Sequence, residues 1–407
     1  MRICVLTHTF PRNDQDVAAA FMKEFCDGLV ENGNQVVVVT PYDPIFNRTG
    51  DNFKVVTYKY IWPESFHLLG YSRSMEADIN LKPYNYLLAP FMIFFGIFAL
   101  LKVVKKEKID LISVHWILPN GIIALIVSYL THVPYTITLP GTDAYLASKN
   151  KIFGLLSKLV AQQSSALFSN SRWHLDKILN LGVKIAVSEV ITYPVDIKKF
   201  VPLKSGLGAL REKYNLSEKN FVVLAVGRLV YKKGFEYLIK ALPEVIKNYP
   251  NLKVIIGGDG DLYSDLVDLA KKMGVEEQIF FPGNLKRDEI VYYYNLADVV
   301  VTPSIVDEGG NIDGRPLVIL ESMACGKPQI VTNLPGISDA LKDEVNALLV
   351  PQKDSPALTR ALLKIIESKD LRTKMGKENR KLAEDKLSTT QIGKRYSYFF
   401  EKVKKSD

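Results

Sequence analysis

Short runs of β-branched and other apolar residues alternate with helix-length amphipathic segments along almost all of the 407-residue chain. This alternation predicts parallel sheets with helices on both faces, which is an α/β fold. In the first half, strands are predicted at residues 2–7, 35–40, 54–59, 111–115, 135–139, 166–169 and 189–192. In the second half, they are predicted at residues 222–226, 253–256, 279–281, 299–302, 329–332 and 347–350.

The pattern is interrupted near residues 194–220, where two prolines and a polar, glycine-containing stretch predict a linker. A chain of this length is also too long for one ordinary core. We therefore expect an amino-terminal domain at 1–200 and a carboxyl-terminal domain at 201–387. The last predicted helix comes after the second sheet is complete, and we expect residues 388–407 to pack back on the first domain.

The composition, with 47% hydrophobic and 24% charged residues, is typical of a soluble globular protein. Cys4, Cys26 and Cys325 are an odd number of cysteines with no paired spacing, which favours a reducing compartment over a disulfide framework. The amino terminus also lacks a basic and then apolar signal sequence. We therefore expect the protein in the cytoplasm.

The formal net charge of +8 fits a basic surface alone, a nucleic-acid partner, an anionic membrane surface or anionic substrates. No RNA-binding or helix-turn-helix signature supports nucleic acid, so we expect no such partner. The segment 87–101 bears on the membrane, because it is an uninterrupted apolar run followed by lysines. It is shorter than the roughly 20 residues of a spanning helix. It predicts a buried or partly exposed helix, with a membrane-contacting surface and a membrane span as the alternatives.

The segment 303–328 holds two acids, Asp313 and Glu321, separated by a Gly-x-Pro turn and a short apolar run. The strand predicted at 299–302 precedes them. We therefore expect Asp313 in a loop at the strand's carboxyl end and Glu321 a little over two turns into the next helix. That edge of an open α/β sheet is where ligands bind. Carboxylates accept strong hydrogen bonds from hydroxyl groups, so the pair predicts a sugar nucleotide as ligand.

The stretch Gly-Arg-Leu-Val-Tyr-Lys-Lys-Gly at 227–234 follows a predicted buried strand and opens a helix. Gly227 allows a ligand close to the backbone, and the helix start presents free amides. Arg228 and Lys233 add two cations, which suits a leaving diphosphate on which negative charge builds. A solvated basic turn is the alternative for this stretch alone, but the acidic segment at a matching sheet edge favours the diphosphate site.

A second glycine turn, at 257–260, includes Gly258. A dinucleotide-binding fingerprint would require a third glycine at the position of Tyr263, and it would follow the first strand of its unit. The turn therefore predicts a position close to a sugar nucleotide and disfavours an NAD-binding dehydrogenase.

These three segments are similar to family 4 of the retaining, nucleotide-sugar-dependent glycosyltransferases, also called glycosyltransferase group 1. Further similar pieces lie at 10–21, 114–121, 141–143 and 194–202, so the resemblance covers nearly the whole chain. It implies the GT-B fold, with two Rossmann-like domains whose parallel sheets face each other across a cleft. The acceptor would bind the first domain, and the nucleotide-sugar donor the second.

The resemblance also implies the activity. The expected enzyme is a metal-independent, retaining hexosyltransferase without cofactors. Its donor would be a nucleoside-diphosphate sugar, and its acceptor a glycan, a lipid-linked sugar or a small molecule. The cysteines and the amino terminus predict that the enzyme works in the cytoplasm, and the net charge and the run 87–101 make the inner face of the membrane a further candidate partner surface. A sugar-nucleotide epimerase on the same fold and a non-catalytic sugar-nucleotide-binding protein are the alternatives.

Residue roles follow from the resemblance position by position. The donor-binding positions that it implies are Gly227, Arg228, Lys233, Gly258, Leu317, Val318 and Glu321. The catalytic positions that it implies are Asp313, Arg228, Lys233 and His115. The acceptor-binding positions are Asp16 and Asp143, and no metal ligand is implied.

Three departures from the family pattern affect these roles. Asp313 stands where the family has glutamate, in a longer acidic loop from which Glu308 is a second candidate. Pro140 replaces a histidine, which leaves His115 either as a site residue or as a satisfied core histidine. The first loop lacks the usual glycine pair, so we expect Asp14 or Asp16 to cap the next helix or to touch the acceptor.

Overall fold

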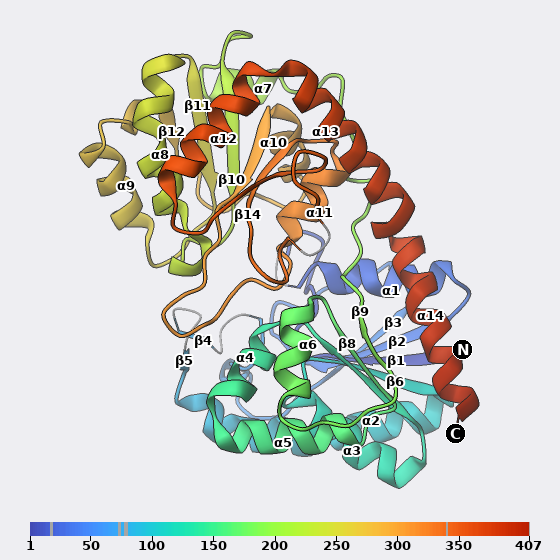
Figure 1. The fold of residues 1–407 in the computed structure, drawn as a ribbon. Helices are drawn as coiled ribbons and strands as arrows, with labels where there is room; N and C mark the ends of the chain where they lie inside the picture. The colour runs from blue at the N-terminus through green and yellow to red at the C-terminus, as the bar shows by residue number, and fades with distance from the viewer. Residues whose placement is uncertain (17–18, 72–74, 77–79, 339–340, 407) are drawn as a thin grey trace. The chain divides into compact units, whose positions relative to one another are not determined.

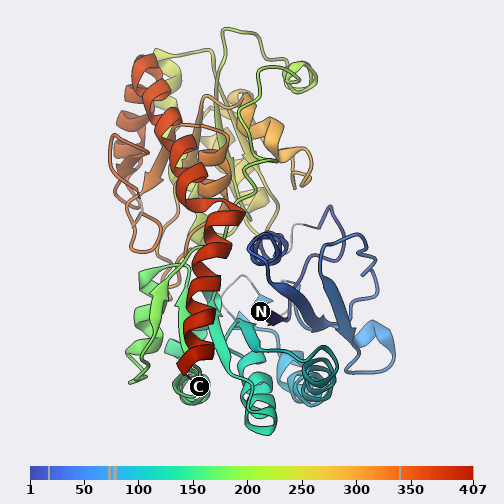
Figure 2. The ribbon, with the colours of Figure 1, turned by 90° about the vertical axis from the view of Figure 1, so that its right-hand side faces the viewer.

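The computed structural model divides the chain into two compact units. Unit 1 is Met1–Pro194 with Thr389–Asp407, and unit 2 is Val195–Ser388. The structure describes residues 1–16, 19–71, 75–76, 80–338 and 341–406. Both chain termini therefore belong to unit 1 (Figure 2).

The first unit ends at Pro194 rather than at residue 200. The reason lies in the packing of the segment that follows. Val195 and Phe200 are buried in a core of unit 2. The Val195 amide also donates to the carbonyl of Leu387, at 2.9 Å, inside the same unit.

Unit 1 contains a seven-stranded sheet in the order β3-β2-β1-β6-β7-β8-β9 (Figure 1). Every pairing in it is parallel. The strands are β1 Arg2–Leu6, β2 Gln35–Pro41, β3 Lys54–Tyr58, β6 Leu111–His115, β7 Tyr135–Leu139, β8 Ala166–Ser169 and β9 Ser188–Val190. A separate antiparallel pair, β4 Met75–Glu76 with β5 Asn80–Leu81, was not expected from the sequence.

Helices cover both faces of this sheet, as parallel strands require. Ile3 and Val5 of β1 point into a core with α1 and α14, while Cys4 and Leu6 point into the core on the other face. The helices of unit 1 are α1 Phe21–Glu31, α2 Tyr84–Glu107, α3 Asn120–Thr131, α4 Thr142–Lys149, α5 Lys151–Gln162, α6 Arg172–Leu179, α14 Thr389–Ser406 and the short η1 Glu64–Phe66.

The last helix, α14, returns to unit 1 and packs against α1 (Figure 2). Tyr396 and Phe400 are fully buried there. The two helices approach closely at a glycine pair: a Cβ on Gly393 would lie 2.0 Å from the carbonyl oxygen of Gly28, and a Cβ on Gly28 would lie 2.4 Å from that of Thr389. Only glycine allows this backbone contact.

Unit 2 contains a six-stranded parallel sheet in the order β12-β11-β10-β13-β14-β15 (Figure 1). Its strands are β10 Phe221–Val226, β11 Leu252–Gly257, β12 Ile279–Phe280, β13 Val299–Thr302, β14 Gln329–Thr332 and β15 Leu348–Val350. Its helices are α7 Gly208–Lys213, α8 Phe235–Asn248, α9 Tyr263–Lys272, α10 Ile290–Leu296, α11 Leu317–Ala324, α12 Ser355–Glu367 and α13 Lys369–Leu382, with the short turns η2 Tyr231–Lys233, η3 Glu276–Gln278 and η4 Ala383–Leu387.

The predicted fold class is confirmed, because each unit is an α/β layer structure around a parallel sheet. Every strand expected from the sequence is present, with ends shifted by one or two residues at most. The apolar segment 87–101 lies inside α2, which is partly exposed: Leu88 and Leu100 are buried, whereas Phe94 and Phe98 face solvent. Among the described residues, α2 is the helix long and apolar enough to cross a membrane.

The glycine contact between α14 and α1 gives a stability prediction. Gly393→Ala places a methyl group against the Gly28 carbonyl, so we expect unit 1 to lose about 1–3 kcal/mol of unfolding free energy. Gly208→Ala is the matched control, because a Cβ there meets nothing within 4 Å. Differential scanning calorimetry should show a lowered transition for the first variant alone. Equal melting temperatures for the two variants would contradict the close contact.

Candidate functional site

The strand orders place one topological switch point in each sheet. In unit 2 it lies between β10 and β13, and in unit 1 between β1 and β6, because the chain order reverses at each central strand. Loops that leave adjacent parallel strands in opposite directions open a crevice at the carboxyl edge, and ligands bind there. The site residues predicted from the sequence are therefore expected in these loops.

In unit 2, backbone hydrogen bonds connect the loop after β10 to the glycine turn after β11. The Leu229 amide donates to the Asp259 carbonyl at 2.9 Å, and the Leu262 amide donates to the Leu229 carbonyl at 2.9 Å. Gly258 has a positive φ, and a Cβ there would lie 1.9 Å from the Gly227 carbonyl oxygen. Gly258 is thus required for the two loops to pack, which holds the cation-bearing loop in place.

Asp313 and Lys233 meet across the switch point. Lys233 ends η2 after β10, and Asp313 lies in the loop between β13 and α11. The Lys233 Nζ is 2.7 Å from Asp313 Oδ2, which also accepts a hydrogen bond from the Ser304 hydroxyl at 3.0 Å. The Lys232 Nζ lies 3.8 Å from Asp313 Oδ1, and Lys232 is buried. The structure thus brings two of the expected catalytic residues into one ion pair.

The charge state of Asp313 follows from this arrangement. Burial alone would raise its pKa, but the two lysine charges and the hydrogen bonds from Lys233 and Ser304 outweigh burial and bring the pKa of Asp313 to about 2. The carboxylate is therefore ionised at neutral pH. It can accept hydrogen bonds from hydroxyl groups, but it is too weak a base to take a proton there.

Glu321 lies one turn inside α11, not a little over two turns as expected. The helix begins only at Leu317, because the residue before Pro316 is disfavoured in the helical region and the Gly-Arg-Pro stretch forms a turn instead. The Glu321 carboxylate is buried, with one oxygen paired to Arg287 and the other accepting from the Tyr294 hydroxyl at 2.7 Å. Its donor-binding role stays a prediction, because both oxygens of its side chain already have partners.

Arg287 was missed by the sequence analysis. It precedes α10 in a polar Lys-Arg-Asp-Glu stretch that resembles any solvated turn, so nothing in the sequence marked it. In the structure it is buried, contacts Glu321 and lies 5.1 Å from the centre of the Phe200 ring. Arg287 therefore fixes the position of Glu321.

The remaining donor-binding candidates surround the same edge. Arg228 lies exposed in the loop after β10, next to Gly227. Leu317 and Val318 form the first turn of α11, where backbone amides have no acceptor within the helix. Glu308, the second candidate acid, is exposed. Asp307 beside it accepts a hydrogen bond from the Asn311 amide at 2.8 Å, which closes the turn 307–311.

At the unit 1 switch point, the loops after β1 and β6 meet at His8. Its ring lies 4.8 Å from the Trp116 ring, and its Nδ1 is 3.1 Å from the Asn120 amide nitrogen. Burial lowers the pKa of His8 to about 4, so the ring is neutral at neutral pH. His8 was not predicted as a site residue, although its place directly after the first strand could have indicated it.

His115 lies in the core rather than at a site. It is fully buried at the end of β6, with Nδ1 2.8 Å from the Tyr193 hydroxyl and Nε2 3.4 Å from the Ser113 hydroxyl. Phe25 packs edge-on against its ring. Burial lowers the pKa of His115 to about 3. Of the two interpretations of His115, the structure supports the core histidine with satisfied hydrogen bonds and does not support the catalytic role.

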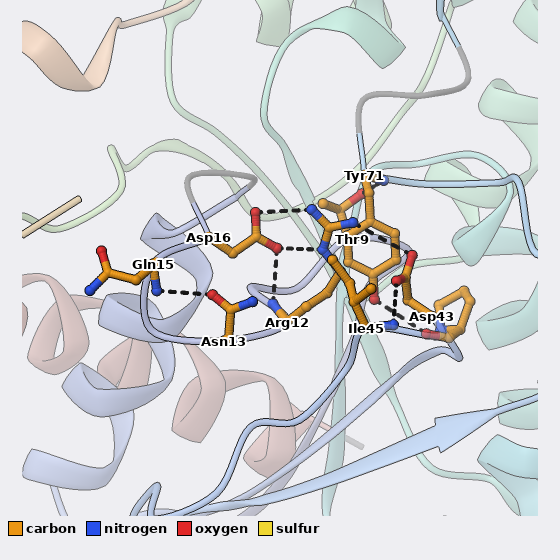
Figure 3. Close-up of polar contacts among 9 residues, drawn as sticks. Thr9, Arg12, Asn13, Gln15, Asp16, Asp43, Ile45 and Tyr71 are labelled. Carbon is orange, nitrogen blue, oxygen red and sulfur yellow. Dashed lines mark hydrogen bonds and ion pairs between the residues drawn. The ribbon is translucent and has the colours of Figure 1, made fainter. Parts of the chain in front are cut away.

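Asp16 is engaged by Arg12, as Figure 3 shows. The Arg12 Nε is 2.6 Å from Asp16 Oδ2, and its Nη1 is 3.6 Å from Asp43 Oδ2. The Tyr71 ring lies 4.7 Å from the guanidinium carbon. The expected helix cap is wrong, because α1 begins after Ala20 with no side-chain cap. Asp16 thus shapes the loop after β1, since its carboxylate already holds Arg12.

The other early acids also have structural partners. Asp14 pairs with Arg48 at 2.9 Å. Asp143 is buried, and its two oxygens accept from the amides of Ile117, at 2.9 Å, and Gly141, at 3.2 Å. Burial raises the pKa of Asp143, although these amides oppose that rise. Asp143 therefore connects the loop after β6 to the loop after β7 at the carboxyl edge of the unit 1 sheet.

Within the described ranges, no group of three or more His, Cys, Asp or Glu side chains could hold a metal ion. Lys232, Lys233 and Arg228 carry positive charge at the unit 2 edge.

Comparison with known proteins agrees with this architecture. The profile of the family described as "Glycosyl transferases group 1" matches residues 208–382. The profile described as "Glycosyltransferase Family 4" matches residues 18–199. Together they cover most of both units, but not β1 or α14.

Individual relatives extend over most of the chain. An uncharacterized glycosyltransferase of Methanocaldococcus jannaschii is 25% identical over 97% of this chain and 96% of its own length. The Escherichia coli UDP-Gal:alpha-D-GlcNAc-diphosphoundecaprenol alpha-1,3-galactosyltransferase is 29% identical over 68% of this chain and 71% of its own. Among solved structures, Anabaena HepE in complex with UDP has a TM-score of 0.76 and 18% identity, covering 99% of this chain and 100% of HepE.

The two Rossmann-like units, each with its loops gathered at a switch point, have the GT-B fold. The chain belongs to the group 1, family 4 glycosyltransferases.

The Asp313 ion pair predicts a specific dependence of stability on pH. Because the folded-state pKa lies below the usual value near 3.9, the pair stabilises the protein above pH 4, and this contribution is lost as pH falls toward 2. Asp313→Asn should cost unit 2 about 2 kcal/mol at pH 7 and should remove this part of the acid destabilisation.

Asp313→Glu is the control, because it keeps the negative charge. Calorimetric melting curves from pH 7 to pH 2 distinguish the two variants. An Asn variant as stable at pH 7 as the wild type would show that the pair contributes nothing to folding.

Proposed function

We propose that the protein is a metal-independent, retaining hexosyltransferase. It transfers a hexose from a nucleoside-diphosphate sugar to a glycan, lipid-linked or small-molecule acceptor. Family membership gives the transferase class, and the finer statement rests mainly on one observation. Asp313 and Lys233 form an ion pair at the unit 2 switch point, next to Arg228 and the first turn of α11.

This arrangement suits a donor that joins a negatively charged diphosphate to a neutral sugar. The ammonium of Lys233 has three N–H donors, so it can hold Asp313 and a phosphate oxygen at once. Arg228 and the α11 amides offer further donors to a diphosphate, whose negative charge grows as the sugar leaves. In this proposal they do the work that a metal does elsewhere.

The ionised Asp313 then faces the sugar rather than the phosphate. Its pKa near 2 makes it a hydrogen-bond acceptor for sugar hydroxyls and not a proton-transfer group. We therefore assign the proton transfer to the leaving phosphate, with the acceptor attacking on the same face that the phosphate leaves. This assignment gives retention of anomeric configuration without a protein nucleophile.

The acceptor is assigned to unit 1, where the partly exposed ring of His8 lies at the switch point and is held by the buried Asn120. The E. coli relative acts on a diphosphoundecaprenol-linked sugar, which supports a lipid-linked acceptor as the first to test. No observation favours the epimerase or the non-catalytic alternative over transfer.

Donor binding is tested by thermal stabilisation with UDP, GDP, ADP and dTDP and their common sugar conjugates. A ligand at 100 times its Kd should add about 2.7 kcal/mol of stability. We expect a clear response to one base and the same response with excess chelator. A response that chelator abolishes would contradict the metal-free part of the proposal, and no response to any donor would contradict donor binding.

Catalytic use of the diphosphate is tested by Arg228→Ala. Loss of a charge-assisted phosphate bond worth about 1.5–3 kcal/mol should lower turnover roughly ten- to a hundredfold. Arg360→Ala, another exposed arginine of unit 2 in α12, should keep wild-type turnover. Steady-state kinetics on the donor identified above measures both. A folded Arg228→Ala variant with wild-type turnover would exclude Arg228 from the reaction.

A further inference from the structure

One face of unit 1 exposes many large apolar side chains. They lie on the outward sides of α2, α3 and α5, and together we call them the apolar face: Tyr86, Leu87, Phe91, Phe94, Phe95, Phe98, Ile126, Tyr129, Leu130, Ile152, Leu155 and Leu159. Tyr129 is 81% exposed, Leu155 70% and Leu87 69%. Single exposed apolar residues are ordinary on soluble proteins, but contiguous groups of this kind mark interaction surfaces.

The three helices lie side by side, with α3 in contact with both α2 and α5 (Figure 1). The apolar face therefore extends over neighbouring helices. A Cβ on Gly96 of α2 would lie 2.7 Å from Ile123 of α3. A Cβ on Gly121 of α3 would lie 2.3 Å from Val160 of α5. The small glycines therefore bring the helices close together. Ring stacking of Tyr86 on Phe153, at 6.5 Å, connects α2 to α5 as well.

The fold does not need these outward side chains. The inward sides of the same helices fill the core against the sheet, with Met92, Leu100, Ile123 and Val160 all buried. Helices on a sheet normally carry charged or polar residues on the opposite side. Here aromatic and aliphatic residues occupy that side, at a cost in solubility that a binding partner would relieve.

The charges on these helices are nearly all positive. Their charged residues are Lys102, Lys105, Lys106, Lys151, Lys158 and Glu107. The single acid, Glu107, is bound to Lys54 at 2.7 Å. On α2 the stripe Leu87, Phe91, Phe94 and Phe98 continues at helical spacing into Lys102 and Lys105. In an interfacial membrane helix, aromatic residues insert into the headgroup boundary while neighbouring lysines stay in water. The stripe on α2 has this pattern.

We propose that the apolar face of α2, α3 and α5 docks on an anionic membrane surface, with the aromatic side chains at the headgroup boundary. The docking is peripheral. Although α2 has the length and hydropathy of a spanning helix, a third of its most apolar window is buried inside the protein. Removing α2 from unit 1 to span a bilayer would expose the core that Leu100, Val103 and Val104 complete.

The topology gives the docked face a direction. α2 returns from the carboxyl end of β3 to the start of β6, so its first turns lie toward the carboxyl edge of the sheet. Tyr86 and Leu87 therefore lie toward the edge that carries His8 and Asn120, while the lysines lie toward the opposite edge. A lipid-linked acceptor would then meet unit 1 from the membrane side, a step that rests on the proposed function.

Flotation with vesicles of phosphatidylcholine and phosphatidylglycerol tests the docking directly. At low salt, wild-type protein should float with vesicles, and Phe94→Ser/Phe98→Ser should bind about tenfold more weakly or worse. Both side chains are about half exposed, so folding should be unaffected, and calorimetry checks this. Tyr398→Ser is the control, because Tyr398 on α14 is 53% exposed but outside the apolar face.

The electrostatic part has its own matched pair. Lys102→Gln/Lys105→Gln should weaken binding to anionic vesicles about tenfold, and high salt should weaken wild-type binding similarly. Lys374→Gln/Lys377→Gln in α13 has the same spacing and the same change of net charge, and should bind like wild type.

Three outcomes would overturn the proposal. The first is that the wild type does not float with vesicles. The second is that Phe94→Ser/Phe98→Ser and Tyr398→Ser float equally well. The third is that the wild type binds no vesicles and forms a dimer, which Phe94→Ser/Phe98→Ser dissociates. The last would assign the face to a second copy of this chain. Because flotation needs no donor or acceptor, its failure is separate from a failure of the proposed transfer activity.

Discussion

Parallel strand pairing is the constraint on which both units depend. Each connection must run back from one edge of the sheet to the other, and most of these connections contain helices, which cover both faces. Parallel pairing also gathers the carboxyl ends of all strands on one edge. The first consequence explains the paired cores of unit 1, including the return of α14 to cover the α1 face. The second explains why residues far apart in the sequence, such as Lys233 and Asp313, meet at one switch point. The same cover of helices leaves α2, α3 and α5 with an outer side that the fold does not use.

The ion pair at the unit 2 edge decides what its acid can do. Lys233, with Lys232 behind it, keeps Asp313 ionised, so the carboxylate binds hydroxyl groups and does not exchange protons near neutral pH. The shorter aspartate, in place of the family's glutamate, reaches the lysine at 2.7 Å. Glu321 is held in a different way, between Arg287 and Tyr294. The two acids that looked alike in the sequence therefore have different surroundings: one faces lysines at the loop, and the other is fixed inside the fold.

Local pattern predicted most of the fold. Strands such as β6 and β13 are short buried apolar runs with clear ends, and their limits were predicted to the residue. The start of α11 was misplaced because a turn through Pro316 resembles a helix start in the sequence. Side-chain partners were harder to predict. Asp16, Asp143 and His115 are residue types suited to catalysis, but each is held by a structural partner. The partners are Arg12, Ile117 and Tyr193, respectively. These contacts form only when the chain folds, so the sequence did not reveal them. Arg287 was missed for the same reason, whereas His8 was missed although its place directly after the first strand could have indicated it. The exposure of α2 also depended on tertiary packing, since the sequence shows an apolar helix but not which side faces solvent.

The central claim is retaining transfer from a nucleoside-diphosphate sugar without a metal. It is tested most directly by following the reaction by NMR with each donor, an undecaprenol-type or sugar acceptor, and excess chelator. The account predicts that nucleoside diphosphate appears only with acceptor present and that the new glycosidic bond keeps the donor's anomeric configuration. An inverted linkage, an activity that chelator abolishes, or a donor that is epimerised without acceptor would contradict it.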